Sequence, residues 1–220
     1  YIEPQVCVVK PEIDDGLTVY TSTQGPRGVR NEVARLLSLP LSKVNVVPMT
    51  VGGGFGGKHC LAEPLASAIA LKLNRTVRLE LTRSEDFMCG TPSPGCQIKI
   101  KTGATKKGIF RCLQVKILMD NGVFSGPWGK LLAEFIGSTY IVSNVKIEFY
   151  EIITNKPAGG AYRAPSAPLS AFALESNVDM MVRELGIDPI DFRQKNASKT
   201  GDQMINGKPW PNINITECLN

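Results

Sequence analysis

Hydrophobic and polar residues alternate near the start of the chain, which is the pattern of half-buried β-strands. The alternation runs from Gln5 to Val9 and again from Leu17 to Thr21. Asp14-Asp15-Gly16 lies between them and is a typical turn sequence, so the two segments are predicted to form a β-hairpin. From about Arg27 to Leu37 the apolar positions take a helical spacing, which predicts an amphipathic helix.

A glycine-rich segment follows the next predicted strand. The strand covers residues 43–51, KVNVVPMTV, and the glycine segment VGGGFGGK spans Val51 to Lys58. A helix is predicted over residues 61–73, LAEPLASAIALKL, with Pro64 in its first turn. Because this helix is apolar on most sides, we expect it to be buried. Residues 76–82, TVRLELT, predict a further strand.

The second half of the chain has the same mixture of patterns. Two alternating strands are predicted within residues 97–122, a short helix over 131–139 and another strand over 144–155. An amphipathic helix is predicted over 170–185, and Gly186 is suited to end it in a left-handed conformation. Strands and helices in this order predict the α+β class, with mixed β-sheets and packed helices.

Turn-forming residues divide the chain into two predicted parts. The TPSPG segment, residues 91–95, indicates a boundary. We therefore expect one α+β half over 1–93, which contains the glycine loop, and a second over 94–220. Asp188, followed by proline, is predicted to cap a helix, and Thr216 to cap one that begins at the end of the chain. Both ends look truncated, so we expect a segment of a longer polypeptide.

Composition excludes several classes of protein. The chain has 220 residues, of which 43% are hydrophobic and 20% charged, as in an ordinary soluble protein. The net charge of +5 is spread thinly, so no nucleic-acid-binding stripe is predicted. No apolar run is long enough to span a membrane. The six cysteines form no CxxC pair, which favours reduced thiols in a cytoplasmic protein. A single histidine, His59, argues against a zinc site or a Ser-His-Asp triad.

The glycine segment is compatible with three interpretations from the residues alone. Gly52, Gly57 and Lys58 match a phosphate loop, GxxxxGK, but His59 stands where that motif needs serine or threonine for Mg²⁺. The same glycines match the dinucleotide motif GxGxxG, and Glu80 ends the next predicted strand. The third interpretation is that the glycines only form a turn.

The segment VGGGFGGK also closely resembles the signature loop of the molybdenum hydroxylases, the family that includes xanthine dehydrogenase and aldehyde oxidase. Residues 21–47, TSTQGPRGVRNEVARLLSLPLSKVNVV, resemble the family's strand-Thr-Gln-helix segment before that loop. Residues 159–168, GGAYRAPSAP, are similar to its Ala-Phe-Arg-Gly loop. YIEP, LGIDPIDFRQKN and GDQMINGK follow the family pattern in the same order, so the resemblance covers nearly the whole chain.

This resemblance implies a molybdenum cofactor that is held by the dithiolene of a molybdopterin, or of its cytosine dinucleotide form. The implied cofactor-binding residues are Gln24, Gly53, Gly54, Phe55, Gly56 and Arg163. Phe55 would lie over the metal, Gln24 near its apical ligand, and Arg163 would offer its backbone amide. Each has a simpler interpretation: Phe55 fills the core, Gln24 caps the following helix, and Arg163 pairs with a surface carboxylate.

The resemblance further implies an oxidoreductase that hydroxylates an aldehyde or N-heterocycle with water as the oxygen donor. Its partners would be FAD and 2Fe-2S domains or subunits and the rest of the molybdopterin subunit. The family's catalytic glutamate lies downstream of these residues, so the chain alone is expected to be inactive. Two other hypotheses stay open: a nucleotide- or phosphate-binding module, and a non-catalytic assembly domain.

Three positions depart from the purine-oxidising members of the family. His59 stands where those members have a glutamate, and Pro165 where they have a phenylalanine. Their substrate-binding arginine aligns near Leu131. Xanthine is therefore not the expected substrate. His59 and Lys130 would suit an anionic or carbonyl-bearing substrate, although His59 could equally be solvated or cap the following helix.

Overall fold

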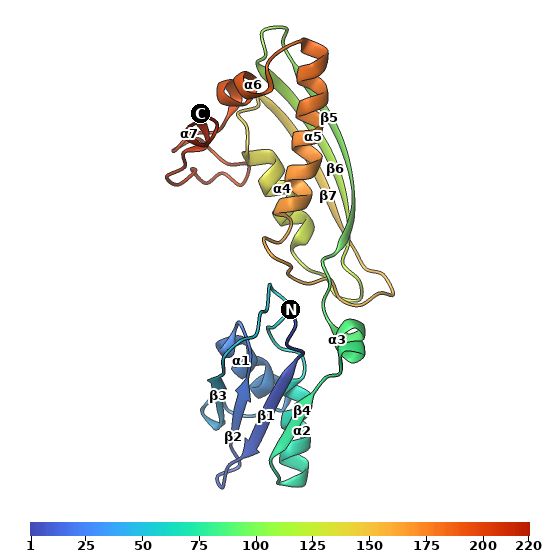
Figure 1. Cartoon of the computed structure of the whole chain (residues 1–220), viewed down its shortest axis with the longest axis vertical. Helices are drawn as coiled ribbons and strands as arrows, with labels where there is room; N and C mark the ends of the chain where they lie inside the picture. The colour runs from blue at the N-terminus through green and yellow to red at the C-terminus, as the bar shows by residue number, and fades with distance from the viewer. The chain divides into compact units, whose positions relative to one another are not determined.

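The computed structural model describes residues 1–220, which fold into two compact units. The first unit consists of residues 1–92 together with 160–163, and the second of 93–159 together with 164–220. The chain passes from one to the other within the TPSPG segment (Figure 1). The short segment 160–163 also belongs to the first unit. Both units combine sheets with helices, which confirms the α+β class.

A four-stranded mixed sheet forms the centre of the first unit. Its strands are β1 (Val6–Pro11), β2 (Leu17–Thr21), β3 (Val44–Pro48) and β4 (Val77–Glu80), in the order β3-β2-β1-β4. β1 is antiparallel to β2, as the hairpin pattern predicted, and also to β4, whereas β2 and β3 are parallel. The parallel pair is possible because a helix connects the two strands.

Helices α1 (Pro26–Leu36) and α2 (Glu63–Leu73) pack on this sheet and enclose its core. The core residues include Val9, Val19, Val29 and Ala66. The expectation that α2 is buried on most sides was wrong, since its Leu65 and Leu73 are each 58% exposed. The fully buried residues of α2 are Glu63, Ala66, Ser67 and Ala70, and its Leu71 packs against the core while partly buried.

Two short helices of the first unit were not predicted. The 3-10 helix η1 (Leu41–Lys43) leads into β3. Helix α3 (Arg83–Cys89) follows β4 and has a capping box, in which Thr82 and Glu85 bond to each other's backbone N–H groups.

The second unit contains a three-stranded sheet in the order β5-β6-β7. β5 (Gly95–Ala104) and β6 (Phe110–Asp120) form the predicted hairpin, and β7 (Asn144–Ile152) runs parallel to β6. Helix α4 (Trp128–Ser138) makes that parallel connection and packs on β6 and β7. Helix α5 (Ala167–Leu185) packs on β5 and on α4.

The last two helices complete the second unit. Helix α6 (Pro189–Asn196) is capped by Asp188, whose side chain accepts two backbone N–H groups, as predicted. Gly186 ends α5 in the left-handed region with φ of 66°, also as predicted. Helix α7 (Ile215–Cys218) has Asn214 at its N-cap, so the prediction of Thr216 was wrong by two positions. No helix of the chain has the length and apolarity needed to cross a membrane.

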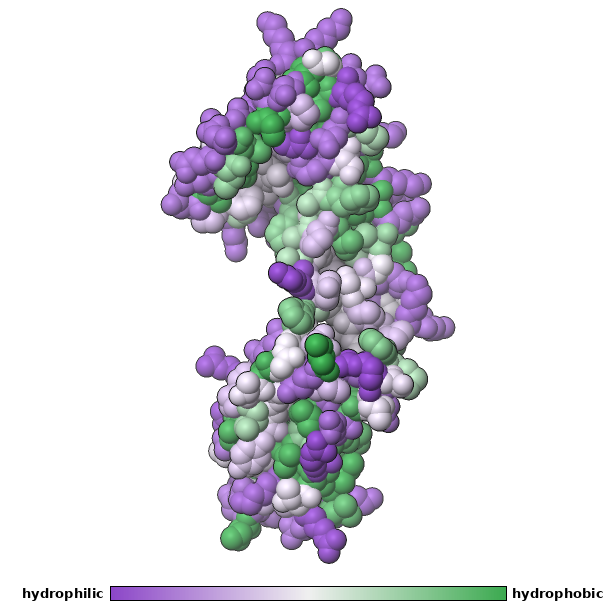
Figure 2. Space-filling model, in the orientation of Figure 1, coloured by the Kyte–Doolittle hydropathy of each residue, from purple (hydrophilic) through white to green (hydrophobic).

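Hydrophobic side chains reach the surface of both units. Figure 2 shows them among hydrophilic residues on each unit, and the exposed apolar side chains include Phe87, Phe124 and Phe172. Apolar atoms contribute more than half of the surface of most folded proteins, so scattered residues of this kind do not by themselves mark a binding site.

Candidate functional site

The glycine loop between β3 and α2 is packed closely against other parts of the first unit. A Cβ atom on Gly52 would lie 2.6 Å from Cβ of Glu3, and one on Gly57 would lie 2.7 Å from the ring of Tyr1. A Cβ on Gly56 would lie 2.5 Å from the carbonyl oxygen of Ala161. All three distances are too short for any residue except glycine. The glycines therefore allow close approach of the protein's own chain from several sides.

Gln24 is bonded to the glycine loop by both its backbone and its side chain. Its N–H donates to the carbonyl of Lys58 at 2.7 Å, and its Oε1 accepts from the N–H groups of Gly56 at 2.9 Å and Lys58 at 3.2 Å. Gly54 makes room for this side chain, because a Cβ there would lie 2.5 Å from Oε1. The capping interpretation of Gln24 was wrong, since the N-cap of α1 is Gly25.

The two donors on Oε1 also fix the orientation of the Gln24 amide. Oxygen must face the loop, so the Nε2 group is directed away from these two donors. No protein acceptor lies within hydrogen-bond distance of Nε2, and Gln24 is exposed. The side chain thus presents a free N–H donor beside the loop.

Three successive backbone N–H groups of the loop also lack an acceptor. These belong to Gly53, Gly54 and Phe55, whereas the N–H of Gly56 is already donated to Gln24. Gly53 and Phe55 have φ values of 88° and 50°, in the left-handed region. Successive N–H groups in such turns can form a concave site for an anion.

Phe55 is held with its ring half exposed. Its exposed fraction is 49%, so the interpretation that it fills the core of this unit was wrong. Its carbonyl accepts the backbone N–H of Arg163 at 2.8 Å. A left-handed conformation is costly for a residue other than glycine and persists only where its surroundings impose it. The contact with Arg163 is one such constraint.

Arg163 is connected to the loop through its backbone. The guanidinium group makes no hydrogen bond or ion pair and is exposed, so the alternative interpretation, a pairing with a surface carboxylate, was wrong. The neighbouring contact of Ala161 with Gly56 brings the segment 160–163 directly against the glycine loop. The structure therefore joins Gln24, the glycine loop and Arg163 in one place.

Lys58 argues against a phosphate loop. Its side chain is completely buried and forms an ion pair with Glu3, and its ammonium group lies 5.0 Å from the centre of the Tyr1 ring. A phosphate-loop lysine has to reach the phosphates of the ligand. The structure also argues against the dinucleotide interpretation. That motif belongs to a mostly parallel sheet, whereas β4, the strand after the loop and α2, pairs antiparallel with β1.

The three predicted substrate residues lie in different units. His59 follows the loop in the first unit, is exposed, and makes no side-chain hydrogen bond. It does not cap α2, whose N-cap is Ala62. Leu131 lies in the first turn of α4, and Pro165 just before α5, both half-buried in the second unit.

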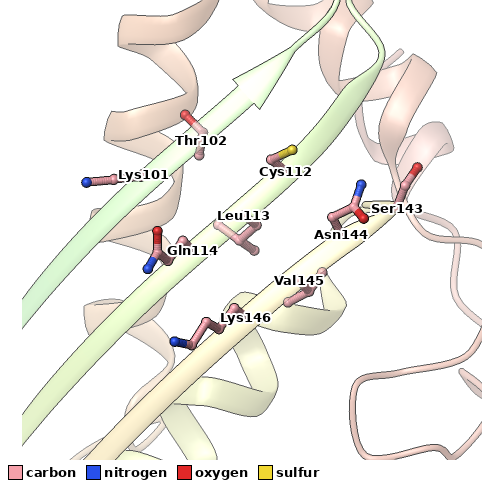
Figure 3. A pocket seen from close by; sticks show the side chains of 9 residues that line it. All are labelled: Lys101, Thr102, Cys112, Leu113, Gln114, Ser143, Asn144, Val145 and Lys146. Carbon is pink, nitrogen blue, oxygen red and sulfur yellow. The ribbon is translucent and has the colours of Figure 1, made fainter.

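A shallow hollow of about 560 Å³ lies over the strands of the second unit (Figure 3). It is lined mainly by β5, β6 and β7, and Lys101, Gln114 and Lys146 are among its residues. It contains none of the predicted site residues. No group of three His, Cys, Asp or Glu side chains is placed to hold a metal ion.

A family model described as the molybdopterin cofactor-binding domain matches residues 1–197. The chain belongs to this family. Proteins of known sequence and of known structure match it over most of its length. The xanthine dehydrogenase molybdenum-binding subunit of Escherichia coli O157:H7 is 33% identical over 215 residues, which are 94% of this chain and 28% of that protein. The nicotinate dehydrogenase large molybdopterin subunit of Eubacterium barkeri is 32% identical over 224 residues, which are 100% of this chain and 53% of that protein.

A solved structure shows that the fold is shared. The aldehyde oxidoreductase of Desulfovibrio gigas superposes with a TM-score of 0.91 at 27% identity, over 99% of this chain and 24% of that one. The chain thus spans between about a quarter and a half of the proteins that it resembles.

Reasoning from the sequence missed three residues that contact the glycine loop. Tyr1, Glu3 and Gln5 alternate along the first residues and reach the loop together: Glu3 accepts from Gly52, Tyr1 packs on Gly57, and the Gln5 amide donates to the carbonyl of Gly57 at 2.8 Å. The sequence signal for a shared role was their spacing, since every second residue of an extended segment lies on the same face. It identifies a shared face, but not the segment that the face contacts.

Proposed function

We propose that this chain is the part of a molybdenum-dependent oxidoreductase that holds molybdopterin against the glycine loop. One observation carries the proposal: the unpaired N–H groups of Gly53, Gly54 and Phe55 lie beside the unpaired Nε2 of Gln24. These donors suit a polar, anionic cofactor, because backbone N–H groups in a turn bind anions without a charged side chain. The residues present therefore fit the cofactor that the family binds.

Each predicted residue has a role in this proposal. The N–H groups of Gly53, Gly54 and Phe55 bind the anionic parts of the cofactor, while Gln24 donates from Nε2. Gly56 keeps Gln24 in place, since its own N–H is already used. The half-exposed Phe55 ring covers the cofactor, and the backbone N–H of Arg163 fixes the conformation of Phe55. Gln24 would thus act through a hydrogen bond to the cofactor rather than as a metal ligand. Arg163 would act only through Phe55, because its backbone N–H, which was expected to face the cofactor, is donated to the Phe55 carbonyl.

The proposed reaction is the oxidation of an aldehyde or N-heterocycle, with water as the oxygen donor. The bound cofactor supplies the redox chemistry, and the residues above supply binding and orientation. We further propose a catalytic glutamate outside these 220 residues, and FAD and 2Fe-2S centres on other domains or subunits that remove the electrons. The resemblance further assigns substrate positions to His59 in the first unit and to Leu131 and Pro165 in the second. Of the residues at or next to these positions, His59 and Lys130 would suit an anionic or carbonyl-bearing compound.

The decisive test is the cofactor content of the full native polypeptide that contains this segment. We expect about one molybdenum by mass spectrometry and one pterin by fluorescence after oxidation per chain, as one cofactor site requires. Gln24→Ala is expected to lower both contents, whereas Gln114→Ala, an exposed glutamine on β6, should leave them unchanged. Absence of metal and pterin from protein made in cells that synthesise the cofactor would contradict the proposal.

The same preparation separates the two other hypotheses. A nucleotide-binding module would be stabilised against heat by Mg·ATP. The burial of Lys58 argues against this hypothesis. A non-catalytic assembly domain would retain its partner subunits without any cofactor. Loss of molybdenum on substitution of Gly54 would contradict that hypothesis.

A further inference from the structure

Lys58 is buried more completely than a lysine normally is. The whole residue is 1% exposed and its side chain 0%, although lysine is almost never fully buried unless it is paired. Its partner is the carboxylate of Glu3, and the hydroxyl of Ser22 lies 3.5 Å from the ammonium nitrogen. The ring of Tyr1 faces the same ammonium group at 5.0 Å. Residues from separate segments thus surround one charge.

Glu3 connects that charge to the start of the glycine loop. The same carboxylate oxygen that pairs with Lys58 accepts the N–H of Gly52 at 2.9 Å. Glu3 also packs so closely on Gly52 that no Cβ would fit there. The first glycine and the last residue of the loop are therefore tied to one carboxylate.

Lys58 also connects the charge to Gln24. Its carbonyl accepts from the N–H of Gln24 at 2.7 Å and from the hydroxyl of Thr23 at 3.2 Å, and its own N–H donates to Oε1 of Gln24. The position of the Gln24 amide thus depends on where the Lys58 backbone lies. That backbone position is set in turn by the buried side chain.

We propose that Lys58 and Glu3 form a positioning pair, which holds the glycine loop and the Gln24 amide in the arrangement that binds the cofactor. The proposal rests on the proposed function for its final step, the effect on the cofactor. The Lys58 side chain is fully buried, whereas that of Glu3 is 33% exposed. Even a fully buried ion pair is weak evidence for stability, since well-packed apolar residues often replace one at no cost. Polar groups retained in such a place can instead specify one arrangement of the chain, and here the pair joins both ends of the loop.

The test compares Glu3→Gln, Lys58→Met and the double variant in the full native polypeptide. The matched control is Lys10→Met with Glu12→Gln, an ion pair of the same unit that lies on the surface. Hydrogen exchange followed by mass spectrometry reports on the peptide that contains residues 52–59, and needs no cofactor. We expect its amide exchange to become at least about tenfold faster in Glu3→Gln and Lys58→Met. Peptides from β5 and β6, and all peptides of the control, should keep their rates.

A second measurement distinguishes positioning from general stabilisation. Loss of an interaction that orients a cofactor ligand lowers affinity by about 10–100-fold, so cofactor release should accelerate correspondingly in Lys58→Met. Because Lys58 acts through Gln24, adding Gln24→Ala should cause little further acceleration. If Lys58→Met and Gln24→Ala together accelerate cofactor release by the product of their single effects, the proposal is overturned. Unchanged amide exchange over residues 52–59 would also overturn it.

The outcomes also separate this proposal from the proposed function. A native protein that lacks molybdenum and pterin, yet shows the expected exchange in the loop, would leave the positioning pair in place and contradict only the cofactor. A protein that carries the cofactor, but shows no local change in Glu3→Gln, would contradict only the positioning pair. Glu3→Gln keeps the size of the side chain, so it gives a result even if Lys58→Met does not fold.

Discussion

At the scale of single residues, the space around Gly54 limits this position to glycine. The backbone lies against the amide of Gln24, whose oxygen is held by two N–H groups from the other side of the loop. A methyl group at Gly54 would displace either the loop or Gln24. Both displacements would disturb the donors assigned to the cofactor.

Gly54→Ala is therefore expected to lower molybdenum content and to destabilise the protein by about 1–3 kcal/mol, the usual effect of overpacking. Gly28→Ala is the matched control. Gly28 lies inside α1, and a Cβ there would meet nothing within 4 Å. Gly28→Ala should be more stable than the natural protein by about 0.5–1 kcal/mol, because alanine is more favourable than glycine within a helix. Chemical unfolding and metal analysis of both variants test this, and full metal content in Gly54→Ala would contradict it.

The residues of the site differ in how far the sequence could predict them. Gln24, the glycines, Phe55 and Arg163 were predicted from their resemblance to family motifs, and the structure brings them together in one unit. Their roles toward the cofactor stay predictions. Glu3 was missed, because its bond to Gly52 spans 49 positions and neither residue has a local pattern that indicates the other.

At the scale of elements, periodicity predicted most strands and helices but not how deeply each is buried. The β1–β2 and β5–β6 hairpins and helices α5 and α6 follow from their sequences. For α2, composition predicted burial on most sides, yet the structure exposes Leu65 and Leu73. Composition gives the apolar area of a helix, whereas burial depends on which neighbours are present.

Helix α3 had a sequence signal that was overlooked. Thr82-Arg-Ser-Glu85 is a capping-box sequence, and the structure contains both of its hydrogen bonds. Thr82→Ala should destabilise the protein by about 0.5–2 kcal/mol. The control is Thr76→Ala, an exposed threonine that makes no side-chain hydrogen bond. Equal unfolding midpoints for the two variants would mean that the capping box contributes nothing.

The carboxylate of Asp120, at the end of β6, is predicted to make the stability of the folded state depend on pH. Asp120 accepts from Lys156 and from Thr154, both at 2.5 Å, and the pairing with Lys156 is the main reason that its pKa falls from 3.8 to about 2. A lowered carboxyl pKa stabilises the folded state above the unfolded value of 3.8. This contribution is lost as the pH falls from 3.8 through about 2.

Asp120→Asn should accordingly melt at a lower temperature than the natural protein at neutral pH, with a difference that shrinks over that acid range. Asp15→Asn, in the exposed turn between β1 and β2, is the control. Melting curves recorded across the range test the prediction. A difference that stays constant down to the lowest pH would show that the Asp120 charge is not responsible.

At the scale of the whole molecule, the chain is proposed to hold a cofactor, and the proposed proton-moving group lies outside it. The groups around the loop are backbone amides, a glutamine, a phenylalanine and an arginine whose side chain makes no hydrogen bond or ion pair. Oxidation of a substrate also requires a base and a route for electrons. The related proteins are about two to four times longer than the segment they share with this chain, which leaves room for both.

We therefore predict that the isolated 220 residues have no hydroxylase activity toward aldehydes or N-heterocycles, whereas the full native polypeptide with its partner subunits does. Circular dichroism should first establish that the isolated chain is folded. Turnover is then measured with an artificial electron acceptor, so that missing FAD and 2Fe-2S centres cannot account for a negative result. Inactivity of the folded, cofactor-loaded segment would agree with a base that lies outside these residues. Detectable turnover would instead place the base among these residues, and His59, exposed beside the loop, would be the first to substitute.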